Sequence, residues 1–229
     1  MVVLLAVLTF AVFVTVDLLR ERRRNVVLLA EGEALQKALV NVDSKTVGGF
    51  KLAPALAYHP GHTWVHWVSE DTAYVGVDDF ARRLIGQDAK FDLPEVGMHV
   101  HQGSDAIHVK RDGQTAHLLS PVGGEIIGVN PAARGDKGAA FKDNFGKGWL
   151  FKVKSPRLFQ DLSNLLTGSL AEHWMQDAND RFRYRLCMAS GSVIQDGGQP
   201  VEDIGGTLDP EEWSSLTEEF LHLKARSHE

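Results

Sequence analysis

The run HTWVHWVSEDTAYVGV, residues 62–77, decides how the middle of this chain folds. It holds two short apolar stretches, HTWVHWV and TAYVGV, separated by polar turn residues. Four similar runs follow before residue 155: AIHVK, TAHLL, GEIIGV and GWLFKVK. Short runs rich in β-branched and aromatic residues, bounded by turn signals, are typical of strands. The sequence therefore predicts a mainly β domain, a sandwich or small barrel, over residues 58–154.

The composition is that of a folded protein, and the sequence contains no familiar catalytic motif. Its 229 residues are 44% hydrophobic and 24% charged, with a net charge of −6. The only basic cluster lies near the start, so nucleic acid is not an expected partner. A single cysteine, Cys187, excludes an internal disulfide. We find no phosphate loop, dinucleotide fingerprint or nucleophile elbow, so we expect neither catalytic residues nor enzyme activity.

The first segment indicates a membrane anchor. Residues 2–19 are almost wholly apolar, and as a helix they would extend about 27 Å, enough to span a bilayer. Four arginines follow directly: Arg20, Arg22, Arg23 and Arg24. Basic residues stay on the cytoplasmic side of a membrane. We expect residues 1–24 to be a single-pass anchor of the inner membrane, with the amino terminus outside and the remainder of the chain in the cytoplasm.

Asp17 is the one acidic residue in this apolar run. A carboxylate within hydrocarbon is costly, so its side chain needs a partner or a route to water. Arg20, one helical turn further on, is the partner we favour. The alternative is a polar contact between Asp17 and another membrane subunit.

Two further segments flank the β domain. Residues 25–57 predict a juxtamembrane linker that includes a helix over residues 26–42. Residues 155–229 predict a helical extension interrupted by a short hairpin at residues 192–204. Leu170, Trp174, Ala178, Phe182 and Leu186 would form one helical stripe. Asp209 and Pro210 would start the last helix. Four aromatic side chains could pack internally or dock a partner: Trp174, Phe182, Trp213 and Phe220.

Five stretches of the chain resemble one known family when they are taken together. They are YHPGHTWV (58–65), YVGVDDFARRLIG (74–86), LPEVG (93–97), SPVGGEIIGVN (120–130) and FGKGWLFKVK (145–154). Their order and wording are similar to those of the lipoyl-carrying H protein of the glycine cleavage system. The resemblance covers roughly 100 residues, and it implies a barrel-sandwich hybrid of the lipoyl-domain type.

The same resemblance implies that the family's cofactor residue is missing. H proteins carry lipoate on a lysine at a hairpin tip, eight residues before the proline of a Pro-Val pair. Counting back from Pro121 leads to Gly113. Asp112 and Gly113 both tolerate the positive φ of a tight hairpin turn, which predicts that the hairpin is kept. Lys110 is a poor substitute because it lies on the strand before the tip. We therefore expect no cofactor.

Histidines suggest a metal or pH-sensing site as an alternative. His59, His62 and His66 lie close in sequence, but zinc needs three or four converging ligands, and structural roles are the simpler interpretation. Four more histidines could share a face of neighbouring strands and become charged below about pH 6.5. These are His99, His101, His108 and His117.

The functional expectation is a non-catalytic accessory subunit of a larger membrane protein complex, of the photosynthetic reaction-centre type or a respiratory one. Its cytoplasmic β domain would act as a scaffold or cap, and its partners would be the lipid bilayer and other subunits of that complex. The alternative is a lipoyl carrier or docking component related to glycine cleavage and one-carbon metabolism.

Overall fold

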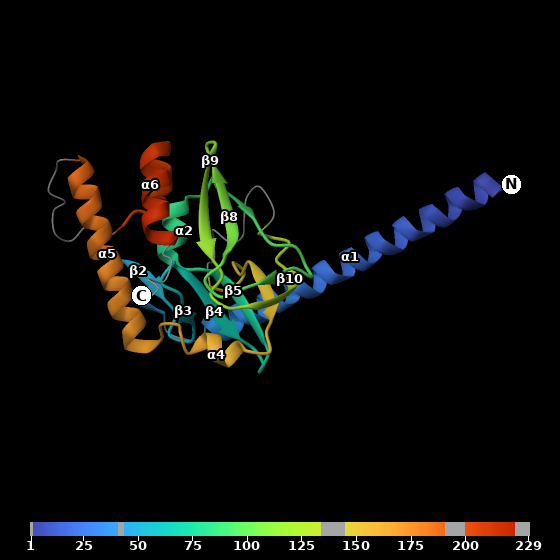
Figure 1. Cartoon of the computed structure of the whole chain (residues 1–229), viewed down its shortest axis with the longest axis horizontal. Helices are drawn as coiled ribbons and strands as arrows, with labels where there is room; N and C mark the ends of the chain where they lie inside the picture. Colours follow the sequence, from blue (N-terminus) through green and yellow to red (C-terminus); the bar gives the residue numbers. More distant parts are fainter. Residues whose placement is uncertain (1, 41–43, 134–144, 191–199, 223–229) are drawn as a thin grey trace.

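The computed structural model describes residues 2–40, 44–133, 145–190 and 200–222, in which a β domain carries one long helix at its N-terminal end and further helices at its C-terminal end (Figure 1). The helices are α1 (Val2–Val40), α2 (Asp79–Ile85), α4 (Leu158–Leu162), α5 (Gly168–Ser190) and α6 (Pro210–Leu221), with a 3-10 turn η1 at Gly205–Thr207. The strands are β1 (Lys45–Val47), β2 (Phe50–Leu52), β3 (Ala57–Tyr58), β4 (Thr63–Trp67), β5 (Thr72–Val77), β6 (Lys90–Asp92), β7 (His99–Val100), β8 (Asp105–Arg111), β9 (Gln114–Leu119), β10 (Gly124–Val129) and β11 (Phe151–Lys154).

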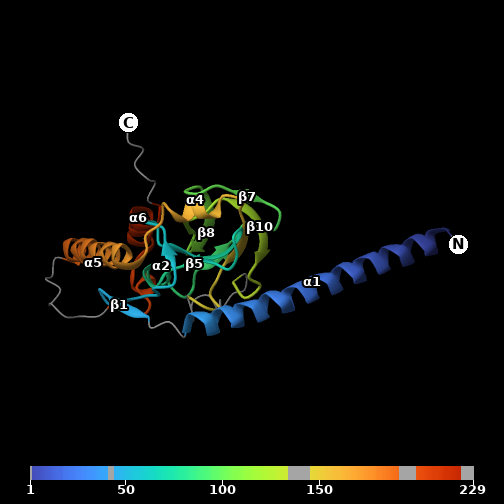
Figure 2. The ribbon, with the colours of Figure 1, turned by 90° about the horizontal axis from the view of Figure 1, so that it is seen from below.

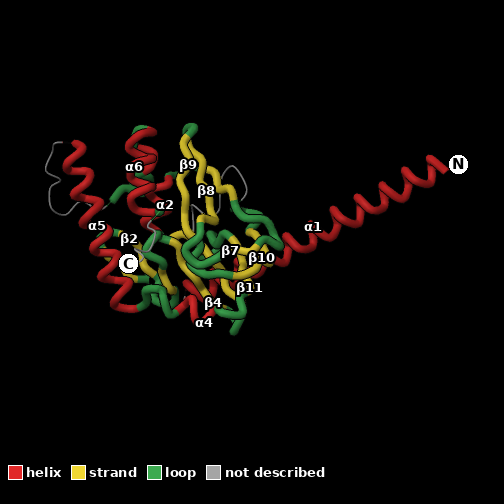
Figure 3. Tube along the Cα trace, viewed as in Figure 1, coloured by secondary structure: helices red, strands yellow, loops and turns green. Residues whose placement is uncertain are grey.

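The strands form a β sandwich, as the sequence predicts (Figure 3). One sheet has six strands in the order β3-β4-β5-β11-β10-β7, the other has three in the order β6-β8-β9, and β1 and β2 pair separately. All of the pairings are antiparallel. Each of the six apolar runs named above overlaps one strand of these sheets. The core includes Trp64, Phe80, Ile107, Trp149 and Phe151, none more than 1% exposed.

Helix α1 is a single rod of 39 residues that projects away from the β domain (Figures 1 and 2). The predicted membrane helix and juxtamembrane helix are thus one continuous element. Asp17, Arg20 and the three arginines that follow are exposed, and no hydrogen bond or ion pair joins Asp17 to Arg20 within the described part of the chain. Judged over the residues that the structure describes, none of the helices combines the length and the apolar character that a membrane crossing requires.

The last third of α1 packs on the β domain. Leu28 and Leu35 are 7% and 4% exposed, and Gly32 lies against the indole of Trp149. Glu31 accepts hydrogen bonds from the hydroxyl of Tyr74 at 2.8 Å and from the ammonium of Lys152 at 3.0 Å. A pair of leucines and a shared carboxylate thus fix α1 to the six-stranded sheet.

The helices after residue 155 differ in one detail from the sequence prediction. The first of them, α4, ends at Leu162, and the backbone of Leu166 then pairs with that of Tyr58 in both directions. The buried row of α5 runs through Ala171, Met175, Ala178 and Phe182, whereas Leu170, expected in the stripe, is 64% exposed. The predicted hairpin at residues 192–204 falls largely outside the described residues.

Helix α6 begins as the sequence predicts. The carboxylate of Asp209 accepts hydrogen bonds from the backbone N–H groups of Glu211 and Glu212, which caps the helix, and Pro210 occupies its first position. The helix packs over α2 and β9.

Candidate functional site

The β8–β9 hairpin ends in a two-residue turn where the resemblance places the cofactor lysine. Asp112 and Gly113 have φ values of 47° and 80°, so both adopt the positive φ that a type I′ turn requires. A side chain at Gly113 would meet nothing within 4 Å, because the tip is open to solvent. Only backbone conformation, and not lack of space, disfavours a larger residue at this position.

Lys110 lies on β8 and is held in an ion pair. Its ammonium is 2.8 Å from a carboxylate oxygen of Asp92 on β6, the neighbouring strand. The hydrogen bond from Lys110, followed by its positive charge, lowers the pKa of the Asp92 carboxyl. Lys110 therefore points along the face of the sheet toward β6 and not outward from the hairpin tip.

A buried polar pair supports the start of α2. The Nδ1 atom of His62 lies 2.7 Å from an oxygen of Asp78, and both side chains are fully buried. The other oxygen of Asp78 accepts from the N–H of Ala81, which caps α2. The His62 ring stacks on Phe80 at 4.2 Å between centroids and lies 4.6 Å from Trp174. These contacts give His62 a packing and capping role.

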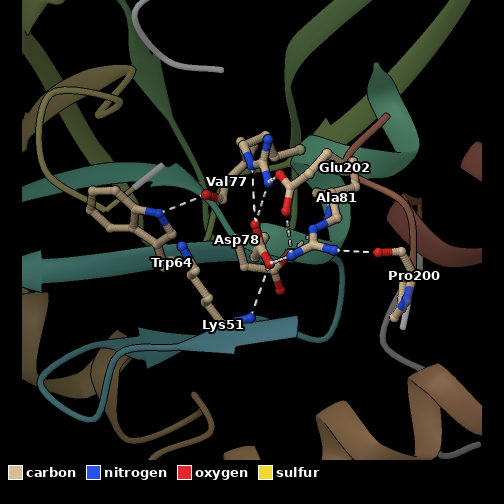
Figure 4. A network of polar contacts seen from close by, with 10 residues as sticks. Lys51, Trp64, Val77, Asp78, Ala81, Pro200 and Glu202 are labelled. Carbon is tan, nitrogen blue, oxygen red and sulfur yellow. Dashed lines mark hydrogen bonds and ion pairs between the residues drawn. The ribbon is translucent and has the colours of Figure 1, made fainter. Parts of the chain in front are cut away.

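A second group of charges joins α2 to the chain just before α6. Asp79, whose side chain is 1% exposed, accepts hydrogen bonds from Arg82 at 2.7 Å and forms an ion pair with Arg83 at 2.9 Å. Both guanidinium groups also reach Glu202, and Arg83 donates to the carbonyl of Pro200 (Figure 4). Burial alone would lower the pKa of Arg82, but hydrogen bonds to Glu202 and Asp79 outweigh it and raise that pKa.

The four aromatic residues considered for partner docking face the interior instead. Phe182, Trp213 and Phe220 are at most 3% exposed. The indole N–H of Trp213 donates to the carbonyls of Leu84 and Ile85 at the end of α2. Trp174 is partly buried against the His62 ring. These side chains attach the C-terminal extension to the β domain, and they form no exposed docking surface.

The three histidines at and before β4 lie in separate environments. Within the described part of the chain, His59, His62 and His66 do not converge on a common point, since His62 is engaged by Asp78 and the Nδ1 of His59 accepts from the N–H of Gly61. Burial, and then the nearby His62, lowers the pKa of His59 to about 4.

The four-histidine strand face does not form either. His99 lies on β7 in the six-stranded sheet, whereas His108 and His117 pair across the three-stranded sheet. With Asp105, the latter two form a compact group on the hairpin.

Some of these residues carry a local sequence signal and others do not. Asp78 directly precedes the helical run DFARRLI, and an Asp just before a helical run is the usual signature of a helix cap. Glu31 and Glu202 contact residues 43 or more positions away, at Tyr74 and at Arg82 and Arg83, and nothing in their own neighbourhood predicts these contacts.

Comparison with known proteins identifies the family. Residues 56–178 match the model of the family described as Glycine cleavage H-protein, which is more than half of the chain. The chain belongs to the glycine cleavage H-protein family. The glycine cleavage system H protein of Aeromonas hydrophila is 35% identical over 111 residues, which cover 48% of this chain and 85% of that protein. The corresponding protein of Thermobifida fusca is 37% identical over 112 residues, 49% of this chain and 86% of that protein.

A solved structure is also similar to the chain. The crystal structure of a glycine cleavage system H protein from Mycobacterium marinum is 27% identical and covers 46% of this chain and 87% of its own, with a TM-score of 0.43. The family match ends within α5, so α1 and α6 lie outside it.

Proposed function

We propose that this chain is an H-protein family member that offers its β domain as a docking surface to other proteins and carries no lipoyl arm. The observation behind the proposal is the hairpin tip. Asp112 and Gly113 form a tight turn at the position where the family's lysine is expected, and neither side chain can form the amide bond that attaches lipoate.

Lys110 is not a suitable replacement. A lipoyl arm must swing freely between enzymes, which requires an attachment point at an open tip. Lys110 instead projects from β8 toward β6 and pairs with Asp92. Attachment of lipoate there would remove the ammonium charge and leave Asp92 without this partner.

Relationship to the glycine cleavage H proteins supports a docking role, because a protein that recognises an H-type surface would find one here. The partner we propose is an enzyme of the glycine cleavage system or an assembly that binds H proteins in the same way. The proposal is non-catalytic: the chain would hold a partner or compete for one.

Intact-mass measurement tests the absence of the arm. The full chain is co-expressed with a lipoate ligase, beside Gly113→Lys and Lys110→Arg variants. We expect no added lipoyl mass on the unmodified chain, and we expect Gly113→Lys to gain one because its lysine stands at the open tip. A lipoyl group on the unmodified chain that disappears in Lys110→Arg would establish the rival carrier function.

Competition tests the docking role. Glycine cleavage enzymes are assayed with a genuine lipoylated H protein while the full chain is added in increasing amounts. We expect inhibition that more H protein relieves. If neither inhibition nor direct binding occurs at tens of micromolar chain, the docking proposal fails.

We further propose, on the sequence pattern and despite the finding above that none of the described helices qualifies as a membrane crossing, that residues 2–19 attach this domain to the inner membrane, with the amino terminus outside and the β domain in the cytoplasm. Support comes from the apolar run itself, from the arginines at its end, and from exposed side chains such as Phe10 and Phe13, 72% and 80% accessible on the projecting part of α1. Membership of a larger membrane complex, photosynthetic or respiratory, stays a prediction.

Alkaline carbonate extraction of cell membranes tests the attachment. We expect the full chain to stay in the membrane pellet and a Phe10→Arg/Phe13→Arg variant to be released. Val26→Arg/Val27→Arg is the matched control, because these exposed residues lie beyond the arginine cluster. Release of the unmodified chain would contradict membrane insertion.

A further inference from the structure

The β8–β9 hairpin gathers three metal-ligating side chains at its base. His108 and His117 are directly opposite each other on the two strands, with ring centroids 4.9 Å apart. Asp105 lies between them: one oxygen is 2.7 Å from Nδ1 of His117 and the other is 3.4 Å from Nε2 of His108. One ligand atom from each residue can be chosen so that all three lie within 4.8 Å of one another.

The surroundings of this group favour a cation. A hollow of about 230 Å³ beside His117 is lined by Thr115, Ser214, Thr217, Glu218 and His222, and none of the described residues that line it is a lysine or arginine. His222, at the end of α6, places its ring 5.9 Å from that of His117. His222 could thus supply a third nitrogen ligand from a different element, and Glu218 places a carboxylate on the wall of the same hollow.

We propose that Asp105, His108 and His117 form a binding site for a divalent transition metal, with zinc as the ion it fits best. Two imidazole nitrogens and one carboxylate oxygen are the ligands that zinc takes at about 2.0–2.2 Å. The three side chains are 38%, 42% and 40% exposed, so small rotations can draw the ligand atoms together and water can complete the coordination.

An Asp–His hydrogen bond alone does not account for the arrangement. That bond needs one histidine, whereas the hairpin places a second one opposite it and α6 brings a third alongside. The metal would join the hairpin to α6, the helix that lies outside the family match. This proposal does not rest on the docking role proposed above, because metal binding is measured on the chain alone, so one can fail without the other.

Titration of Zn²⁺ into the full chain in detergent, followed by calorimetry, tests the site. We expect one zinc to bind per chain. Mutation of a residue that only hydrogen-bonds to a metal ligand lowers the metal affinity ~10–100-fold. Loss of two ligands themselves in His108→Ala/His117→Ala should therefore weaken zinc binding by at least about 100-fold. His222→Ala should weaken it less. His99→Ala/His101→Ala, which removes one exposed histidine on β7 and one just after it, should leave it unchanged.

The visible absorption of bound Co²⁺ provides a second measurement, which reports on the metal ligands directly and not on the stability of the fold. Cobalt held by nitrogen and oxygen ligands in a four-coordinate site absorbs visible light strongly, and the spectrum should vanish in His108→Ala/His117→Ala while circular dichroism shows the fold retained. The proposal is overturned if the full chain binds no zinc, or if this variant binds zinc and cobalt as the unmodified chain does.

Discussion

Burial controls the protonation of the residues that lead into β4. The Tyr58 hydroxyl donates to the carbonyl of Ala53 and accepts from its N–H, and burial raises the pKa of this phenol. His59, one residue on, is 8% exposed, and its pKa falls to about 4 for the same reason. A buried neutral imidazole makes folding sensitive to acid.

We expect the stability of the domain to fall as the pH drops from about 7 toward 4. As the pH falls, the unfolded chain binds a proton at His59 near pH 6.5, whereas the folded chain does so only near pH 4. The free energy of unfolding is therefore highest above about pH 6.5 and decreases as the pH drops from there toward 4. At pH 5 the loss is about 2 kcal/mol.

Urea unfolding at pH 7.5 and pH 5 measures this loss. His59→Asn keeps an acceptor for the N–H of Gly61 but cannot titrate, so its unfolding free energy should change less with pH than that of the unmodified chain by about 2 kcal/mol. His101→Asn, at an exposed histidine, is the control. If the unfolding free energies of His59→Asn and the unmodified chain fell equally between pH 7.5 and pH 5, His59 would not be the source of the loss.

Among the elements, α2 joins the β domain to the C-terminal extension by two kinds of contact. One is the charge cluster of Asp79, Arg82 and Arg83 with Glu202. The other is the indole of Trp213 on α6, which donates to the last carbonyls of α2. Buried polar contacts of this kind are costly to break, because the partner left behind has already lost its water.

The two carboxylates of the charge cluster should differ in their contributions to stability. Asp79→Asn removes the negative charge that faces two mostly buried guanidinium groups, and we expect a loss of about 3 kcal/mol. The Glu202 side chain is 67% exposed, so Glu202→Gln should cost less than about 1 kcal/mol. Chemical denaturation of both variants measures the difference, and equal losses would mean that burial does not govern the cluster.

Trp213→Phe tests the second contact. An aromatic side chain is kept, but the indole N–H is lost, so the carbonyls of Leu84 and Ile85 lose a buried donor, at a cost of about 1–3 kcal/mol. The phenyl ring is also smaller than the buried indole, and the space it leaves adds to this loss. Thermal unfolding provides the measurement. Trp67→Phe, at a tryptophan that is 41% exposed, should leave the midpoint unchanged. A similar shift in both variants would show that the hydrogen bonds contribute little.

Local patterns predicted elements well and long-range contacts poorly. The alternating runs located β4, β5 and β8 to β11, and Asp112-Gly113 predicted the turn, because strand and turn preferences depend on neighbouring residues. Leu170 was assigned to the wrong side of α5, since several stripes of a mixed helix are apolar and only packing selects one. The grouping of Asp105 with His108 and His117 depends on strand register, which the sequence alone did not give.

At the scale of the whole molecule, α1 and the β domain move as one unit if the contact around Gly32 is intact. A Cβ at Gly32 would approach the indole nitrogen of Trp149 to 2.8 Å, and Trp149 is 1% exposed and cannot easily yield. We expect Gly32→Leu to separate α1 from the domain, with faster hydrogen exchange over residues 28–35 and little change in the strands. Ala30→Leu, on the exposed side of the helix, is the control; equal exchange in both variants would argue against a tight contact.

Because α1 is continuous, it also fixes how the β domain is rotated about the helix axis. Because each residue of an α-helix turns the chain by about 100° and advances it by about 1.5 Å, one residue inserted between Leu19 and Leu28 would swing the domain by more than a quarter of a revolution about the helix axis. Seven residues, close to two full turns, would restore its heading and only raise it by about 10 Å. The number of residues in this stretch therefore encodes which side of the domain faces any neighbour that holds the amino-terminal part of α1.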